Sequence, residues 1–206
     1  MDSSKRAAHW NEVYASKRPN QVSWFQAAAE PSMRMIRASG VAPDAALIDI
    51  GGGASVLVDE LLAATFKDVS VLDIAETALE RTITRLGAGA AKVQWIAADV
   101  LSWTPQRSYD LWHDRAVFHF LTEEKERTAY RAVLSKALKP GGTLILAAFA
   151  ADGPERCSGL PVRRWSAEML AAEFGDEFQA IETSREEHRT PWGAVQPFTW
   201  TRFQNV

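Results

Sequence analysis

The fold is decided by residues 47–53, which read Leu-Ile-Asp-Ile-Gly-Gly-Gly. An apolar run there ends in an acid and passes into a glycine turn, and a helical pattern follows. The next apolar run, at residues 69–72, also ends in an acid, Asp73. This succession of strand, glycine turn, helix and acid-ended strand is typical of parallel sheets that hold a nucleoside-containing cofactor at their carboxyl edge.

Composition narrows the class of protein. The chain has 206 residues, 47% of them hydrophobic and 24% charged, which suits one compact domain. With 23 Lys+Arg against 26 Asp+Glu the net charge is −3, which disfavours a nucleic-acid partner. The single cysteine, Cys157, excludes an internal disulfide and a thiolate metal cluster, and we expect no metal site.

Membrane and targeting signals are missing from the sequence. It has no apolar run of about 18 residues and no recognisable signal peptide. We therefore expect a soluble cytoplasmic protein with no membrane partner, present as a monomer or a homodimer.

Short, continuous apolar runs predict five buried strands, at residues 45–50, 69–73, 93–97, 109–113 and 143–149. Helical patterns lie between them. We expect Thr122 to cap the helix before the fifth strand and Pro140-Gly141-Gly142 to stop that helix. Strands that alternate with helices indicate βαβ units in a parallel sheet.

The two ends of the chain differ from this core. Residues 166–174 predict a helix, and residues 178–188 and 195–203 predict two antiparallel strands. We therefore expect an α/β fold with a Rossmann-like, doubly wound, mostly parallel seven-stranded sheet and a C-terminal antiparallel β-hairpin. In this single domain, 1–40 would form a helical prefix or lid, 41–150 the cofactor-binding core, and 151–206 the substrate loop and closing hairpin.

The charge at residue 49 indicates which cofactor is bound. A dinucleotide fingerprint needs a glycine where Val56 stands, and the Asp49 carboxylate would repel a pyrophosphate. Asp49 suits a cofactor with a cationic near end, such as S-adenosylmethionine. Asp73 is placed to accept hydrogen bonds from ribose hydroxyls, each worth roughly 1.5–3 kcal/mol for a charged group. Asp99, after the third strand, is placed to receive an adenine amino group.

Five motifs in order give residues 45–150 a resemblance to class I S-adenosylmethionine-dependent methyltransferases. They are residues 49–53, Asp73, residues 98–100, residues 109–114 and residues 138–142. The resemblance implies S-adenosylmethionine as cofactor and S-adenosylhomocysteine as product. It places the first acid and the glycines at the methionine part, the second acid at the ribose and the third at the adenine. The expected cofactor-binding residues are Asp49, Gly51, Gly52, Gly53, Asp73, Ile74, Asp99, Val100 and Trp24.

The end of the fourth strand is where this fold places groups near the sulfonium. The candidates for catalysis are His113, Asp114, Arg115 and His119. Two competing interpretations stay open: His119 as a packed core histidine, and Asp114 and Arg115 as a mutual ion pair. The Asn-Pro-Pro-Tyr signature of amide and exocyclic-amine methyltransferases is absent, which disfavours that class of acceptor.

Loops rich in Arg, His and Trp are the candidates for the substrate pocket, and would suit a small anionic or aromatic substrate. The residues named for this role are Cys157, Arg163, Arg164, His188 and Trp192. The competing interpretations are a solvated charged face for the loops, an ordinary small residue for Cys157, and a core position for Trp24.

The prefix, with Trp10, Tyr14, Ser23 and Trp24, also resembles the branch that includes thiopurine and tellurite methyltransferases. This implies methyl transfer to a small-molecule nucleophile, such as a thiol or a chalcogen or metalloid anion. The alternatives are a protein lysine methyltransferase, a non-catalytic S-adenosylmethionine-binding regulator, and an NAD-dependent reductase.

Overall fold

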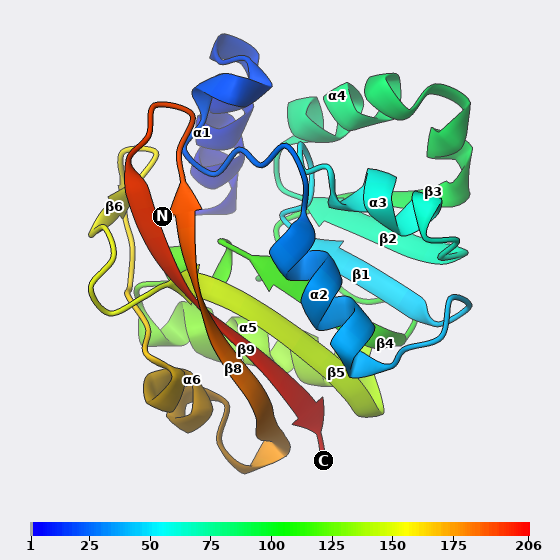
Figure 1. Ribbon diagram of the computed structural model, residues 1–206, viewed down its shortest axis with the longest axis vertical. Coiled ribbons are helices and arrows are strands. Elements are labelled where there is room, and N and C mark those ends of the chain that lie inside the picture. Colours follow the sequence, from blue (N-terminus) through cyan, green and yellow to red (C-terminus); the bar gives the residue numbers. More distant parts are fainter. Residues whose placement is uncertain (1) are drawn as a thin grey trace.

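A seven-stranded sheet in the order β3-β2-β1-β4-β5-β9-β8 forms the centre of the computed structural model, which describes residues 2–206 (Figure 1). Its strands are β1 (Ala46–Ile50), β2 (Asp68–Asp73), β3 (Val93–Ala97), β4 (Tyr109–Arg115), β5 (Leu138–Phe149), β8 (Phe178–Arg189) and β9 (Val195–Asn205). The first five strands are parallel, whereas β9 runs antiparallel to both β5 and β8. The predicted α/β fold, with its mostly parallel sheet and C-terminal hairpin, is confirmed. A small second sheet of β6 (Arg156–Cys157) and β7 (Leu160–Pro161) was not expected.

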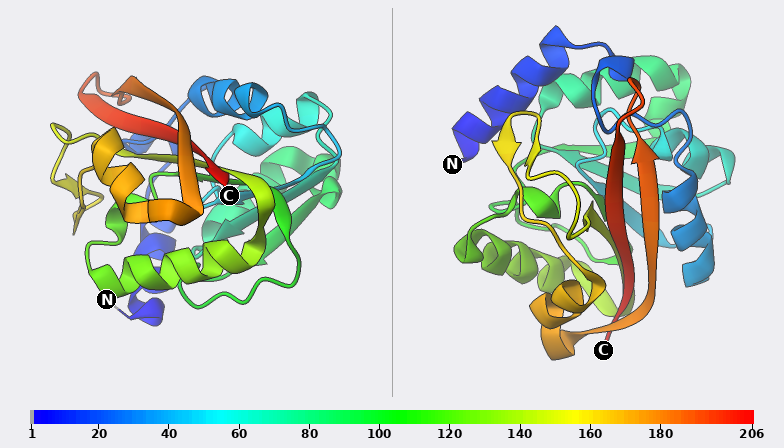
Figure 2. Two further views of the ribbon diagram at one scale, coloured as in Figure 1. Left: turned by 90° about the horizontal axis from the view of Figure 1, so that it is seen from below. Right: turned by 60° about the vertical axis from the view of Figure 1, so that its left-hand side comes forward.

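Helices cover both faces of the sheet. They are α1 (Ser3–Ser16), α2 (Glu30–Ser39), α3 (Leu57–Ala63), α4 (Glu76–Leu86), α5 (Glu124–Ala137) and α6 (Ala167–Phe174), with short 3-10 turns η1 (Pro19–Gln21), η2 (Gly87–Lys92), η3 (Phe118–Phe120) and η4 (Gly175–Glu177). Leu47 of β1 packs in the core cluster with α2 and α3, whereas Ile48 and Ile50 pack in the cluster with α5 and α6. Figure 2 shows the sheet between α2 on one side and α5 on the other.

The start and end of α5 differ from the sequence prediction. The N-cap is Glu123, not Thr122, because the Glu123 and Glu126 side chains each accept a hydrogen bond from the other's backbone N–H. The helix ends at Ala137, before Pro140-Gly141-Gly142, because Leu138 is already extended and pairs with Tyr109 as the first residue of β5. The glycine-rich segment therefore lies inside the start of the strand.

The glycine turn after β1 leaves no room for side chains. Gly51 has a φ of +68° and donates its N–H to the Leu72 carbonyl at 2.7 Å. A Cβ on Gly52 would collide with the Asp49 carboxylate, and one on Gly53 would lie 2.6 Å from both Asp73 Oδ2 and Ala78 Cβ. The turn is therefore packed directly against the two acids that end β1 and β2.

This packing predicts a stability loss for Gly53→Ala. The added methyl group has no space, and overpacking of this kind costs about 1–3 kcal/mol. Gly89→Ala is the control, because its Cβ would meet nothing closer than 3.9 Å. Urea unfolding should show the loss for Gly53→Ala and a change within about 0.5 kcal/mol for Gly89→Ala. Equal free energies of unfolding for the two variants would contradict the packing.

Candidate functional site

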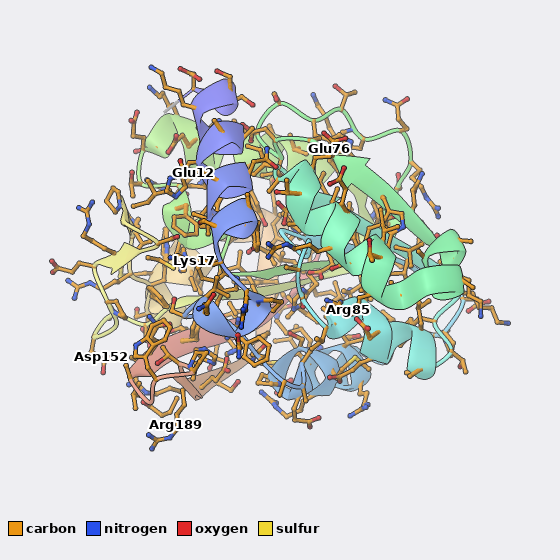
Figure 3. The ribbon with its side chains drawn as sticks, turned by 90° about the horizontal axis from the view of Figure 1, so that it is seen from above. Glu12, Lys17, Glu76, Arg85, Asp152 and Arg189 are labelled. Atoms are coloured by element: carbon orange, nitrogen blue, oxygen red, sulfur yellow. The ribbon has the colours of Figure 1, made fainter. Side chains whose placement is uncertain are left out.

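Two adjoining pockets lie where β1, β2 and β4 end, beneath α1. The first pocket is lined by residues that include Trp10, Tyr14, Asp73, Asp99, Val117 and Cys157. The second pocket is lined by residues that include Lys17, Ser32, Asp49, Gly52, Arg81 and His113. Tyr14, Trp24, Ile50, Gly51 and Arg115 line both pockets. In Figure 3, α1 runs beside α4, and Lys17 follows its C-terminal end.

Asp49 is buried at the end of β1 and is held by its neighbours. His113 lies opposite it on β4, and His113 Nδ1 donates to Asp49 Oδ1 at 2.7 Å. His113 Nε2 lies 3.0 Å from the hydroxyl of Ser32, a buried residue of α2. Within residues 2–206, Asp49 Oδ2 is buried without a hydrogen-bond partner. The carboxylate is thus fixed through one oxygen and unsatisfied at the other.

Asp73 ends β2 and is buried beside the glycine turn. Its carboxylate accepts hydrogen bonds from Gly53 N–H at 3.0 Å and from Ala75 N–H at 2.8 Å. Burial, helped by the nearby charge of Asp49, raises the pKa of Asp73 to about 6, while the two backbone N–H groups oppose the rise. Asp73 therefore faces the first pocket as a group that ionises just below neutral pH.

Asp99 lines the first pocket but is already engaged by the protein. Its Oδ1 accepts the Leu101 N–H at 3.0 Å, and its Oδ2 accepts from Arg6 Nη2 at 2.6 Å and Arg6 Nε at 3.1 Å. Arg6 also lies 3.2 Å from Glu126 of α5. Arg6 therefore ties α1 to the loop after β3 and to α5. Sequence reasoning missed Arg6, since 93 residues separate it from Asp99.

Aromatic side chains wall the first pocket on the α1 side. The ring of Trp10 lies 5.7 Å from Trp24 and 5.1 Å from Phe120, both edge-on. Tyr14 lies 6.1 Å from Trp24. Edge-to-face contacts in this distance range are favourable. Trp24 is therefore part of the pocket wall as well as of a packed aromatic cluster.

Arg115 is a buried cation at the boundary of the two pockets. Its side chain is only 10% exposed, and the guanidinium lies 4.6 Å above the Phe198 ring. Nη1 donates to the Trp24 carbonyl at 3.3 Å, and Nη2 lies 3.6 Å from Glu186 Oε1 of β8. Burial lowers the pKa of Arg115. Its acidic neighbour is Glu186, so the Asp114–Arg115 pair considered from the sequence does not form.

Asp114 lies outside both pockets, in a buried network under η3. Oδ1 accepts the N–H groups of Val117 and Phe118, and Oδ2 accepts the Tyr130 hydroxyl at 2.7 Å. The Trp112 indole N–H donates to the same hydroxyl at 2.8 Å. Burial raises the pKa of Asp114 to about 6. This geometry gives Asp114 the contacts of a residue that shapes the turn after β4.

His119 also lines neither pocket. Its ring packs 4.5 Å from Phe120 and 4.6 Å from Phe149, and Nδ1 accepts the Phe149 N–H at 3.4 Å. Burial lowers the pKa of His119 to about 3, helped by the charge of Arg115. A neutral histidine sealed among aromatic rings matches the packed interpretation.

Of the five substrate-pocket candidates, Cys157 lines the first pocket, and the other four line neither pocket. It is buried, and burial raises the pKa of its thiol to about 11. Arg163 stacks 4.5 Å from Trp165, and Arg164 pairs with Glu155 at 3.2 Å. The last two candidates, His188 and Trp192, lie on the C-terminal hairpin.

His188 and Trp192 have different surroundings. His188 Nε2 donates to the Ser23 carbonyl at 2.6 Å and so holds the prefix against β8. Trp192, at the hairpin turn, is 61% exposed. Across residues 2–206, no group of three His, Cys, Asp or Glu side chains is arranged to hold a metal ion, and no helix has the length and apolar character to cross a membrane.

Comparisons with known proteins show similarity to methyltransferases. Residues 48–144 match the family described as a methyltransferase domain. Nodulation protein S of Bradyrhizobium diazoefficiens is 29% identical over 154 residues, which cover 73% of this chain and 68% of that protein.

Solved structures share the fold. A S-adenosylmethionine-dependent methyltransferase from Anabaena variabilis superposes with a TM-score of 0.74 at 17% identity, covering 100% of this chain and 96% of that one. The 1,6-didemethyltoxoflavin-N1-methyltransferase of Burkholderia thailandensis superposes with a TM-score of 0.69 at 17% identity, covering 100% and 91%. Residues 48–144 of this chain are therefore similar to a methyltransferase domain, and the whole chain shares the fold of solved S-adenosylmethionine-dependent methyltransferases.

Proposed function

We propose that this protein transfers the methyl group of S-adenosylmethionine to a small-molecule nucleophile, such as a thiol or a chalcogen or metalloid anion. The observation that carries the proposal is the buried, unpaired Oδ2 of Asp49 in the wall of the second pocket. An unsatisfied buried carboxylate oxygen is costly, and a cationic ligand removes that cost. The ammonium and sulfonium groups of the cofactor fit this need.

The two pockets divide the cofactor between them. We assign the methionine part to the second pocket, with Asp49 and the backbone of Gly51 and Gly52, while Gly53 positions Asp73 through its N–H. We assign the adenosine part to the first pocket. The residues there are Asp73, Ile74, Asp99 and Val100, with Trp24 between the two parts.

The protein's own contribution to methyl transfer is alignment and exclusion of water. Bound S-adenosylmethionine supplies a methyl group activated by a sulfonium centre. Trp10, Trp24 and Phe120 form an apolar wall beside that centre. Charge disperses in the transition state of such a transfer, so a dry pocket favours it. His113 keeps Asp49 oriented. Asp114 and His119 stabilise the turn after β4, Asp114 by accepting the N–H groups of Val117 and Phe118 and His119 by packing against Phe149.

Similar proteins support a small acceptor. The Burkholderia structure has 1,6-didemethyltoxoflavin bound with S-adenosylhomocysteine. In this chain, α1 and the residues after it cover the first pocket with Trp10, Tyr14 and Trp24. An enclosure of this kind suits a small aromatic or soft nucleophile. A screen of thiols, metalloid oxyanions, phenols and amines, read by S-adenosylhomocysteine release, tests the proposal, and labelled protein bands in a lysate would favour the lysine alternative.

Asp49→Asn tests the cationic end of the cofactor site. Losing the charge should raise the Kd of S-adenosylhomocysteine about 10- to 100-fold, since a charged hydrogen bond is worth roughly 1.5–3 kcal/mol. Binding of 5′-deoxy-5′-methylthioadenosine, which lacks the amino-acid part, should be unchanged. Calorimetry measures both, with Asp59→Asn as a control because Asp59 pairs with Arg85 on the surface. An equal rise in the Kd of both ligands would show that Asp49 does not bind the amino-acid part of the cofactor.

Asp73 predicts a pH dependence of cofactor binding. Its pKa of about 6 means that the carboxylate accepts ribose hydroxyls above that pH and is protonated below it. The Kd of S-adenosylhomocysteine should therefore rise as pH falls through 6, by up to about tenfold per pH unit. Asp73→Asn should bind more weakly at neutral pH and lose this dependence. A pH profile that is the same in Asp73→Asn would assign the titration to another group.

A further inference from the structure

We propose that Arg115 forms an anion subsite for the methyl acceptor, so that the protein methylates acceptors that reach it already ionised, such as acidic thiols, selenols and related soft anions. This rests on the proposed function, and names the substrate class of that same site. The argument depends on what surrounds the Arg115 guanidinium and on what the pocket beside it lacks.

The guanidinium has more donors than partners. It carries five N–H groups. Within residues 2–206 it makes one hydrogen bond, to the Trp24 carbonyl, and Nε and Nη2 are buried without a hydrogen-bond partner. Glu186 balances the charge of Arg115, but at 3.6 Å it is too far away to accept a hydrogen bond. Buried donors without an acceptor are costly, and an anion in the pocket would satisfy them. Because Arg115 lines both pockets, such an anion would lie beside the methyl-donating end of the cofactor.

The neighbouring side chains do not satisfy these N–H donors of Arg115. Glu186 is 3.6 Å from Nη2, and its oxygens already accept from Gln26 Nε2 at 3.1 Å and Trp200 Nε1 at 2.8 Å. The other titratable groups that interact with Arg115 are Cys157, His119 and His188. Burial holds the thiol protonated and lowers the pKa of both histidines, so none of them brings a negative charge.

The first pocket also lacks a base for the acceptor. Tyr14 and Cys157 are its neutral titratable groups, and burial raises the pKa of each. The two carboxylates of the pocket accept hydrogen bonds from the protein: Asp73 from backbone N–H groups and Asp99 from Arg6. In the proposed assignment both carboxylates serve the ribose and the adenine of the cofactor, so neither is left to take the proton of an alcohol or an ammonium acceptor. An acceptor that is already an anion needs no such group.

The chemical step then balances without proton transfer. The acceptor anion forms a bond to the methyl carbon while the sulfur–methyl bond breaks and its electron pair stays on sulfur. The products are the methylated acceptor and S-adenosylhomocysteine. Arg115 holds the acceptor before the step, and the acceptor loses its negative charge as the bond forms, which favours release of the product.

The cofactor carboxylate is the other anion that Arg115 could bind. The second pocket, which we assign to the methionine part, is lined by three further cations, Lys17, Arg18 and Arg81, and none of the three lines the first pocket. We therefore assign Arg115 to the acceptor, and the experiment separates the two sources.

The binding test uses Arg115→Gln, Arg115→Lys and the exposed control Arg189→Gln. Each protein is saturated with S-adenosylhomocysteine and titrated with benzoate or its neutral counterpart benzamide, read by fluorescence of the pocket residues Trp10 and Trp24. Wild type and Arg189→Gln should prefer benzoate by about tenfold or more. Arg115→Gln should lose the preference and Arg115→Lys should keep part of it. Equal binding of benzoate and benzamide by wild type would overturn the subsite.

Retained binding of S-adenosylhomocysteine by Arg115→Gln, with a Kd within about twofold of wild type, shows that the variant is folded and that Arg115 does not serve the cofactor. A loss of about tenfold for S-adenosylhomocysteine but not for 5′-deoxy-5′-methylthioadenosine would assign Arg115 to the cofactor carboxylate and overturn the proposal. Failure of wild type to bind S-adenosylhomocysteine would instead defeat the proposed function itself.

Turnover gives an independent readout. With S-adenosylmethionine, arenethiols should release S-adenosylhomocysteine faster than anilines of the same shape. The pH of half-maximal kcat/KM should move with the acidity of the thiol when thiophenol is replaced by 4-nitrothiophenol. If the pH of half-maximal kcat/KM is the same for both thiols, a group of the protein acts as the base, and the proposal is overturned.

Discussion

The site depends on the burial of one carboxylate, that of Asp49. Burial requires a partner, and His113 supplies it from the neighbouring strand at 2.7 Å, with Ser32 of α2 behind it. The same carboxylate fills the space where a side chain on Gly52 would stand, so the turn after β1 must be glycine. One buried charge therefore sets the residue types on two strands, a helix and a loop, and leaves one oxygen for a cationic ligand.

The prefix is held against the rest of the chain by contacts in and beside the two pockets. Arg6 binds Asp99, the Trp10 ring packs on Phe120, Arg115 donates to the Trp24 carbonyl, and His188 donates to the Ser23 carbonyl. Each contact joins the first quarter of the chain to an element of the sheet edge. The prefix therefore contributes as much as the sheet to aligning the reacting groups and to excluding water from the site.

How far the sequence predicts this site depends on the range of each interaction. The strands, the glycine turn and the acids Asp49 and Asp73 could be predicted, because a few consecutive residues determine them. Ser32 and Glu186 were missed, because they meet His113 and Arg115 only after the chain has folded. The cap of α5 was misplaced by one residue, since Thr122 and Glu123 both suit an N-cap and only the reciprocal bonds with Glu126 decide between them.

Asp114 and Arg115 show why neighbours in a motif take different roles. Successive side chains of a strand point to opposite faces. Asp114 therefore turns to Tyr130 of α5, and Arg115 turns to the pockets and to Phe198 and Glu186 of the hairpin. The sheet separates a pair that looks self-neutralising in the sequence. Because β8 and β9 supply the ring under Arg115 and its acidic neighbour, the C-terminal hairpin positions a residue that lines both pockets and does more than extend the sheet.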